Sequence, residues 1–194
     1  MSSISQPIVV ARGPMGLVRD YSELVKARVT TLIVMTAWCG FYFGAVRSEI
    51  SSLSWTLVHA LVGIALVSAG TAGMNEVMER DLDARMRRTA RRPLVTETMS
   101  VLHAALASMT MIIGGTIYLG LACNWLTAAL TFATSLVYLG FYTPLKTVSP
   151  ICTLIGAIPG AMPPVLGWAA VRGRRAWNSL GRCRVLTAAG RVAG

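Results

Sequence analysis

One stretch of the chain, NEVMERDLDARMRRTARRPL at 75–94, concentrates both signs of charge in a sequence that is 54% hydrophobic and only 13% charged. If a helix continues through this stretch, Asn75, Glu79 and Asp83 lie four residues apart along one of its faces. Three oxygen-bearing side chains on one face suit a hard cation such as Mg²⁺, which takes substrate phosphates as further ligands. The spacing therefore favours a magnesium site.

Basic residues follow this acidic row along the chain. Arg88 and Arg92 repeat the four-residue spacing, and guanidinium groups match phosphate oxygens in pairs. An acidic row followed by a basic row is what a metal-bridged diphosphate needs. A second interpretation is that the charges form solvated pairs in a loop and that the arginines only set membrane topology. Spacing alone leaves both open.

Five apolar stretches must position these residues, and none of the five contains Lys or Arg. A helix of about 20 mostly apolar residues spans a bilayer, so the sequence predicts an all-α, polytopic transmembrane helix bundle. The last stretch contains four prolines, which predict a kinked or broken helix that lines a cavity. The predicted spans are 29–46, 55–78, 100–121, 124–143 and 150–171.

Lys and Arg alternate between the two ends of these spans. Four precede the first span, six lie in 75–94 and Lys146 follows the fourth span, whereas only Arg47 lies between the first and the second. Because positive residues favour the cytoplasmic side, segment 1–28 and the charged loop are predicted to be cytoplasmic. The net charge of +10 lies between apolar spans, so we expect a lipid bilayer and no nucleic acid as partner.

The charged stretch resembles the first Asp-rich motif, N-x-x-x-D-x-x-x-D, of the UbiA superfamily of intramembrane prenyltransferases, with Glu79 in place of the usual first Asp. Its continuation MRRTARRPL, and the stretch FYTPLKTVSPICTLIGAIPGAMPPVLGW at 141–168, resemble one branch in particular, the protoheme IX farnesyltransferases or haem O synthases. DYSELVKARVTTL at 20–32 resembles the start of that family's first helix, although Ala27 stands where Pro is common. The resemblance covers about residues 18–172.

The resemblance implies transfer of a farnesyl group from farnesyl diphosphate to a vinyl group of haem b, with Mg²⁺, in the bacterial cytoplasmic (inner) membrane. It makes Asn75, Glu79 and Asp83 the catalytic, metal-binding residues, and Arg88, Arg92 and Lys146 the cations that neutralise the leaving diphosphate. Tyr142 fits either a diphosphate or haem contact or an interfacial anchor. Two alternatives are a related prenyltransferase with another aromatic acceptor and a non-catalytic membrane fragment.

The end of the chain departs from this resemblance. The family has about nine spans, so 29–171 would be a partial prenyltransferase domain with its C-terminal half missing. Residues 172–194 contain no Asp or Glu and no apolar run long enough for a sixth span. We expect a disordered basic tail, produced by a reading-frame change or an early stop, and a chain that does not complete the reaction.

Overall fold

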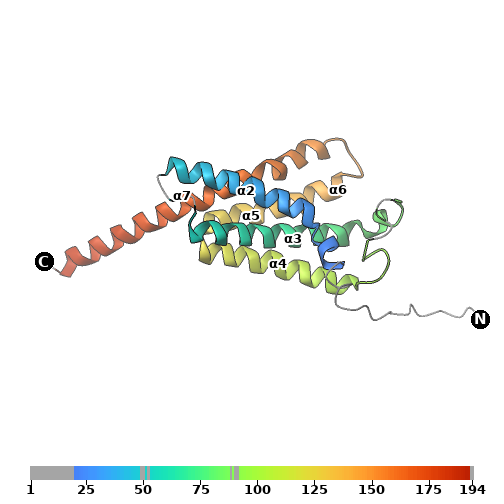
Figure 1. The fold of residues 1–194 in the computed structure, drawn as a ribbon, viewed down its shortest axis with the longest axis horizontal. Coiled ribbons are helices and arrows are strands. Elements are labelled where there is room, and N and C mark those ends of the chain that lie inside the picture. The colour runs from blue at the N-terminus through green and yellow to red at the C-terminus, as the bar shows by residue number, and fades with distance from the viewer. Residues whose placement is uncertain (1–19, 49–50, 52, 88, 90–91, 193–194) are drawn as a thin grey trace, which may run out of the picture.

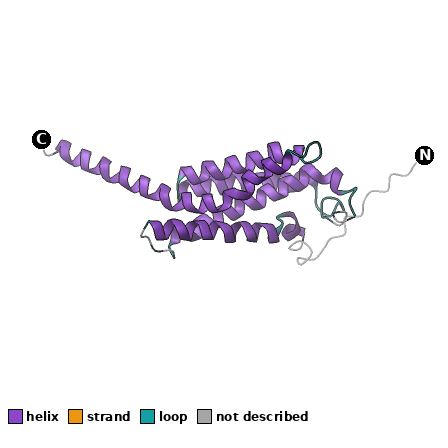
Figure 2. Cartoon of the chain, turned by 90° about the horizontal axis from the view of Figure 1, so that it is seen from above, coloured by secondary structure: helices purple, strands orange, loops and turns teal. Residues whose placement is uncertain are grey.

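The computed structural model describes residues 20–48, 51, 53–87, 89 and 92–192, with side chains as far as residue 173. Every regular element in these ranges is a helix, and the helices run side by side in one elongated bundle (Figures 1 and 2). In chain order they are α2 (Ala27–Arg47), α3 (Trp55–Asp83), α4 (Val101–Ala122), α5 (Trp125–Val137), the π-helical turn η1 (Tyr138–Tyr142), α6 (Thr143–Leu145) and α7 (Cys152–Val192).

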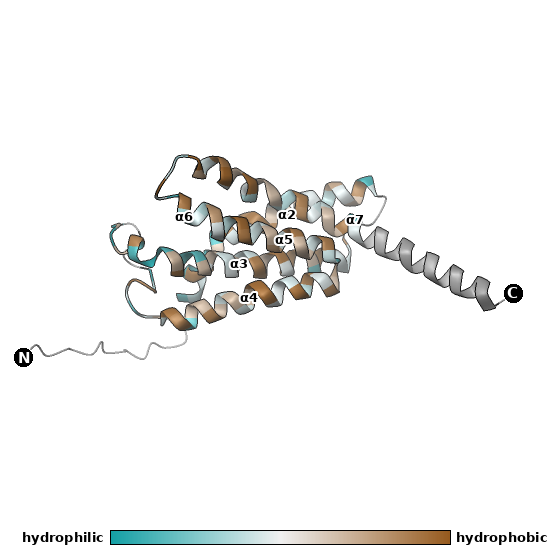
Figure 3. Cartoon of the chain, turned by 180° about the vertical axis from the view of Figure 1, so that it is seen from behind, coloured by the Kyte–Doolittle hydropathy of each residue, from teal (hydrophilic) through white to brown (hydrophobic). Residues whose placement is uncertain are grey.

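Five segments of the described chain are long and apolar enough to cross a membrane. Large apolar side chains are exposed on these segments, as with Leu102 and Leu121, which are 68% and 76% exposed. Figure 3 shows hydrophobic residues along the helices of the bundle. Such a surface is suited to lipid rather than water. The chain is therefore an integral membrane protein, and the predicted bundle is confirmed. The segments are Ala27–Arg47, Trp55–Asp83, Val101–Ala122, Trp125–Leu145 and Cys152–Gly173.

Glycines bring the backbones of α2 and α7 into direct contact. A Cβ atom on Gly40 of α2 would lie 1.9 Å from the carbonyl oxygen of Pro164, and one on Gly167 of α7 would lie 1.9 Å from that of Ala37. Neither position can hold a side chain without moving the backbones apart. Small residues at such positions are how membrane helices pack closely without a hydrophobic driving force.

Asn124 connects the start of α5 to the middle of α7. Its Oδ1 accepts a hydrogen bond from the backbone N–H of Thr127 at 2.8 Å and so caps α5. Its Nδ2 donates to the carbonyl oxygens of Ala169 and Ala170, at 3.2 and 3.3 Å. One buried amide thus holds two spans together at the end of the bundle opposite to 75–94.

Proline affects the last two spans differently. Pro144 lacks the N–H that would bond to the carbonyl of Gly140, and Gly140 lies in the middle of η1, where the α-helical pattern gives way to a π-helical turn. By contrast, α7 is not broken: helix continues through Pro159, Pro163 and Pro164.

The last helix extends beyond the final predicted span. The backbone remains helical as far as Val192. The stretch after residue 172 contains no proline, and Arg and Ala, which favour helix, are among its most frequent residues together with Gly.

Candidate functional site

The predicted acidic row lies on one helix, as its spacing requires. Asn75, Glu79 and Asp83 all belong to the last turns of α3 and are 1%, 6% and 2% exposed. The helix thus continues beyond residue 78, where the apolar stretch ends. Buried carboxylates need a compensating charge or hydrogen bonds, and the two carboxylates obtain theirs from different parts of the chain.

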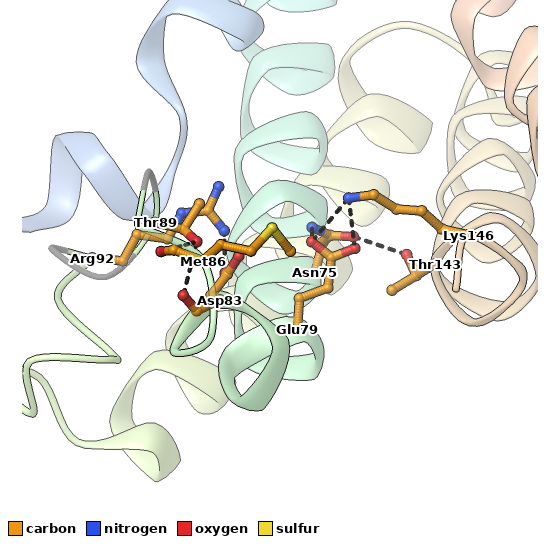
Figure 4. A network of polar contacts seen from close by, with 8 residues as sticks. All are labelled: Asn75, Glu79, Asp83, Met86, Thr89, Arg92, Thr143 and Lys146. Carbon is orange, nitrogen blue, oxygen red and sulfur yellow. Dashed lines mark hydrogen bonds and ion pairs between the residues drawn. The ribbon is translucent and has the colours of Figure 1, made fainter. Parts of the chain in front are cut away.

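Glu79 is held by its own helix and by the segment around α6. Asn75 Nδ2 donates to Glu79 Oε2 at 3.1 Å, and Lys146 Nζ donates to Glu79 Oε1 at 3.2 Å (Figure 4). Thr143 Oγ1 in turn donates to Asn75 Oδ1 at 2.9 Å. These contacts join the end of α3 to the segment around α6, across 67 residues of sequence.

Asp83 is held by the loop that follows α3. Arg92 Nη1 donates to Asp83 Oδ2 in an ion pair, and Thr89 Oγ1 donates to the backbone carbonyl of Asp83 at 2.8 Å (Figure 4). The loop therefore folds back over the end of its own helix. Arg88 lies outside the described residues, so its predicted contact with diphosphate stays a prediction.

The cations and carboxylates pair with one another, rather than forming separate metal and phosphate sides as the sequence suggested. Within the described ranges, no three His, Cys, Asp or Glu side chains converge closely enough to hold a metal. The row offers two carboxylates and one amide oxygen, and Mg²⁺ commonly takes one or two carboxylates and completes its shell with water and phosphate oxygens. Glu76 Oε1 is also buried and has no hydrogen-bond partner among the described residues. The donor set fits Mg²⁺ as a partial shell.

A cavity of about 630 Å³ lies next to α3 just before the acidic row: Thr71 and Ala72 line it, whereas the three residues of the row do not. It is bounded by α2, α3, α5, η1 and α7, with apolar side chains from α2 and α7 and a set of Ser and Thr hydroxyls from α2, α3 and α5. Tyr142 lines it and immediately precedes Thr143, the hydrogen-bond donor to Asn75. The lining also includes Pro159 and Pro163, which confirms that the proline-rich span lines a cavity.

The π-helical turn presents two aromatic rings at this cavity. Tyr138 and Tyr142 both line it, with ring centroids 5.0 Å apart and planes inclined by 28°. A Cβ atom on Gly156 would lie 2.7 Å from the Tyr142 ring, so glycine is what lets this ring lie against α7. Tyr142 therefore belongs to the cavity wall.

Sequence reasoning missed three residues of this region. Two of them, Thr143 and Glu76, neighbour the row. Glu76 could have been predicted from its spacing, because it lies three residues before Glu79 and seven before Asp83, which places it on the same side of α3. Lys26 lines the cavity although we counted it only as a topology signal. Burial, and then the positive charge of Arg92, lower the pKa of Lys26 from its ordinary 10.5.

The chain is similar to several curated proteins. The chain is 63% identical to the protoheme IX farnesyltransferase of Koribacter versatilis over 96% of the chain and 60% of that relative. It is 38% identical to that of Solibacter usitatus, covering 82% of the chain and 58% of the relative. It is 36% identical to the mitochondrial protoheme IX farnesyltransferase of Arabidopsis thaliana, covering 84% of the chain and 37% of the relative. The chain thus spans about half the length of the curated relatives it matches.

No solved structure matches the chain. The UbiA prenyltransferase family matches residues 32–185, which extends past residue 172, where we placed the end of the resemblance. This match covers most of the chain, including the acidic row, Lys146 and the proline-rich span. The chain belongs to the UbiA prenyltransferase family.

Proposed function

We propose that this chain acts in the transfer of a farnesyl group from farnesyl diphosphate to a vinyl group of haem b, giving haem O. The observation that supports this most is the buried row Asn75, Glu79 and Asp83, with Lys146 and Arg92 paired to its carboxylates beside a cavity. The names of the similar proteins, protoheme IX farnesyltransferases, give the acceptor class.

In this reaction the C–O bond of the allylic diphosphate breaks and the diphosphate leaves with the electron pair. A C–C bond forms between the farnesyl group and one vinyl carbon. Water adds its oxygen to the other vinyl carbon and releases a proton, which gives the hydroxyethylfarnesyl side chain. The chain must therefore stabilise a departing anion and shelter a long apolar group.

The residues described here suit both tasks. Bound Mg²⁺ would neutralise diphosphate oxygens, with Asn75, Glu79 and Asp83 as its protein ligands. Lys146 and Arg92 lie at these carboxylates and would stabilise the charge that develops on the leaving group, a role that preorganised cations fill best away from bulk water. Val29, Leu32, Ile33 and Leu166 give the cavity an apolar wall for the isoprenoid chain.

We also propose the orientation of the bundle. The acidic row, Lys26 and Lys146 lie at the same end of the spans, where α3 ends and α7 begins (Figure 1). The four basic residues before the first span, the six in 75–94 and Lys146, against Arg47 alone between the first two spans, support a cytoplasmic position for this end in the bacterial inner membrane, although six further arginines follow the last span at the other end.

The test is binding of farnesyl diphosphate to the purified chain in detergent, with Mg²⁺ and with a chelator. We expect binding that depends on Mg²⁺ and then retention of haem b in preference to 4-hydroxybenzoate. Preference for 4-hydroxybenzoate would assign a different acceptor. Farnesyl diphosphate binding that is equally tight with Mg²⁺ and with the chelator would contradict the proposed site. Haem O formation by the 194-residue chain would support the reaction.

A further inference from the structure

The whole sequence contains only two lysines, Lys26 and Lys146. They are 120 residues apart in the chain, yet both lie at the same region of the bundle. Lys146 pairs with Glu79, and Lys26 lines the cavity together with Tyr142, which is one helical turn before Lys146. A chain with sixteen arginines thus places both of its lysines around one site.

The charge of Lys26 interacts with the acidic row, but its ammonium group does not pair directly with a residue of the row. The carboxylates of Glu79, Glu76 and Asp83 attract its charge, and the guanidinium of Arg92 repels it. No hydrogen bond or ion pair joins its ammonium group to another residue in the described part of the chain. A half-buried cation in these surroundings is desolvated without a direct partner, which is unfavourable unless a ligand supplies one.

The backbone at Lys26 is held in an uncommon conformation. Its φ of 46° and ψ of 56° are left-handed, between the helical turn at 20–24 and the start of α2. For a residue other than glycine this conformation costs about 1–2 kcal/mol. Strain of this kind persists where the surroundings impose it, commonly at ligand-binding positions.

We propose that Lys26 is a third diphosphate-binding cation, which contacts the phosphate oxygens of the substrate from the start of α2 while Lys146 and Arg92 contact them from α6 and from the loop after α3. This inference rests on the proposed function and adds a residue to its site. The start of α2 and the segments that hold Lys146 and Arg92 would then contact the same diphosphate.

Amine modification tests the proposal directly, because the only side-chain targets are the two lysines. The purified chain in detergent is treated with an acetylating reagent at mildly alkaline pH, with and without Mg²⁺ and inorganic diphosphate, and each lysine's modification rate is measured by mass spectrometry. We expect diphosphate with Mg²⁺ to slow modification of both lysines at least about fivefold. Protection of Lys146 alone would overturn the role of Lys26 and leave the proposed function standing, whereas protection of neither would overturn both.

Matched variants separate the charge of Lys26 from its backbone conformation. Lys26→Met and Lys26→Gly both remove the charge, but only Gly adopts a positive φ without strain. We expect both to weaken Mg²⁺-dependent farnesyl diphosphate binding at least about tenfold, Lys26→Arg to stay within about threefold, and Arg28→Met, at an exposed position on the same helix, to have no effect. If Lys26→Gly keeps the affinity that Lys26→Met loses, the residue acts through its backbone and the proposal is wrong.

Discussion

The side chains around Glu79 show how a buried carboxylate is oriented by residues far away in the sequence. Thr143 donates to the amide oxygen of Asn75, Asn75 donates to one oxygen of Glu79, and Lys146 donates to both oxygens of Glu79. Each residue in this series donates a hydrogen bond to the next, and buried polar groups require such partners. Changing any one of them therefore changes the position of the carboxylate as well as the residue itself.

Asp83→Asn should weaken Mg²⁺-dependent farnesyl diphosphate binding by about 10- to 100-fold, since a charged contact contributes about 1.5–3 kcal/mol. The substitution keeps the shape of the side chain but removes the charge that Arg92 and a metal would share. Titration of the detergent-purified variant measures the change, and Asp81→Asn is the control because Asp81 is exposed on the same turn of α3. Equal effects of the two substitutions would show that Asp83 has no special role.

Glu79→Asp should be tolerated, with affinity for farnesyl diphosphate within about threefold of the unchanged chain, because the carboxylate remains. Glu79→Gln should lose at least about tenfold, roughly 1.4 kcal/mol, since the buried amide would no longer supply the negative charge that pairs with Lys146 and a metal. Binding titrations of the two variants side by side check this. A greater loss for Asp than for Gln would mean that length, and not charge, is what this position requires.

The residues of the site could be predicted from the sequence only where they follow a local period. Asn75, Glu79 and Asp83 share one face because a helix repeats every 3.6 residues, and that is visible in the spacing. The contact of Lys146 with Glu79 depends on how α3 packs beside α6, which spacing does not encode. Lys26 was missed for the same reason, since its approach to the cavity depends on the break before α2.

The helices themselves were easier to predict than their irregularities. An apolar run of about 20 residues must span the bilayer, so the five spans were predicted with ends within a few residues, except where α3 and α7 continue beyond the apolar run. The turn η1 was not predicted, because a π-helical turn depends on how one unpaired carbonyl is accommodated. The continuity of α7 through three prolines was not predicted either.

Gly167→Ala should destabilise the packing of α2 against α7. The added Cβ would lie 1.9 Å from the carbonyl of Ala37, and overpacking of this kind costs about 1–3 kcal/mol. We expect the melting temperature in detergent to fall by several degrees. Gly114→Ala is the matched control, because a Cβ on Gly114 of α4 meets nothing within 4 Å. An equal fall for both variants would contradict direct backbone contact between α2 and α7.

The bundle holds the acidic row and both lysines at one of its two ends. The acidic row, both lysines and the loop with Arg92 lie where α2 starts and α3 ends, and the connection near residue 51 lies at the opposite end (Figure 1). Because successive spans alternate in direction, one orientation in the membrane fixes the side of every connection.

Single cysteines introduced into a variant without native cysteines should therefore react from opposite sides of the membrane. We expect Arg85→Cys and Thr147→Cys to react with an impermeant thiol reagent from the cytoplasmic side and Ser51→Cys to react from the other side; all three positions are exposed. Labelling of inverted and right-side-out vesicles makes the comparison. The reverse pattern would overturn the proposed orientation and move the site to the other face.

The two ion pairs, Lys146 with Glu79 and Arg92 with Asp83, leave the acidic row electrically balanced before any ligand arrives. Mg²⁺ alone would have to displace both cations, and diphosphate alone would have to draw them from buried carboxylates, so each would leave charges unmatched. If both arrived together, Glu79 and Asp83 would hold the metal, and Lys146 and Arg92 would donate to the phosphate oxygens. The two ligands would then bind cooperatively, and each would raise the affinity for the other by the same factor.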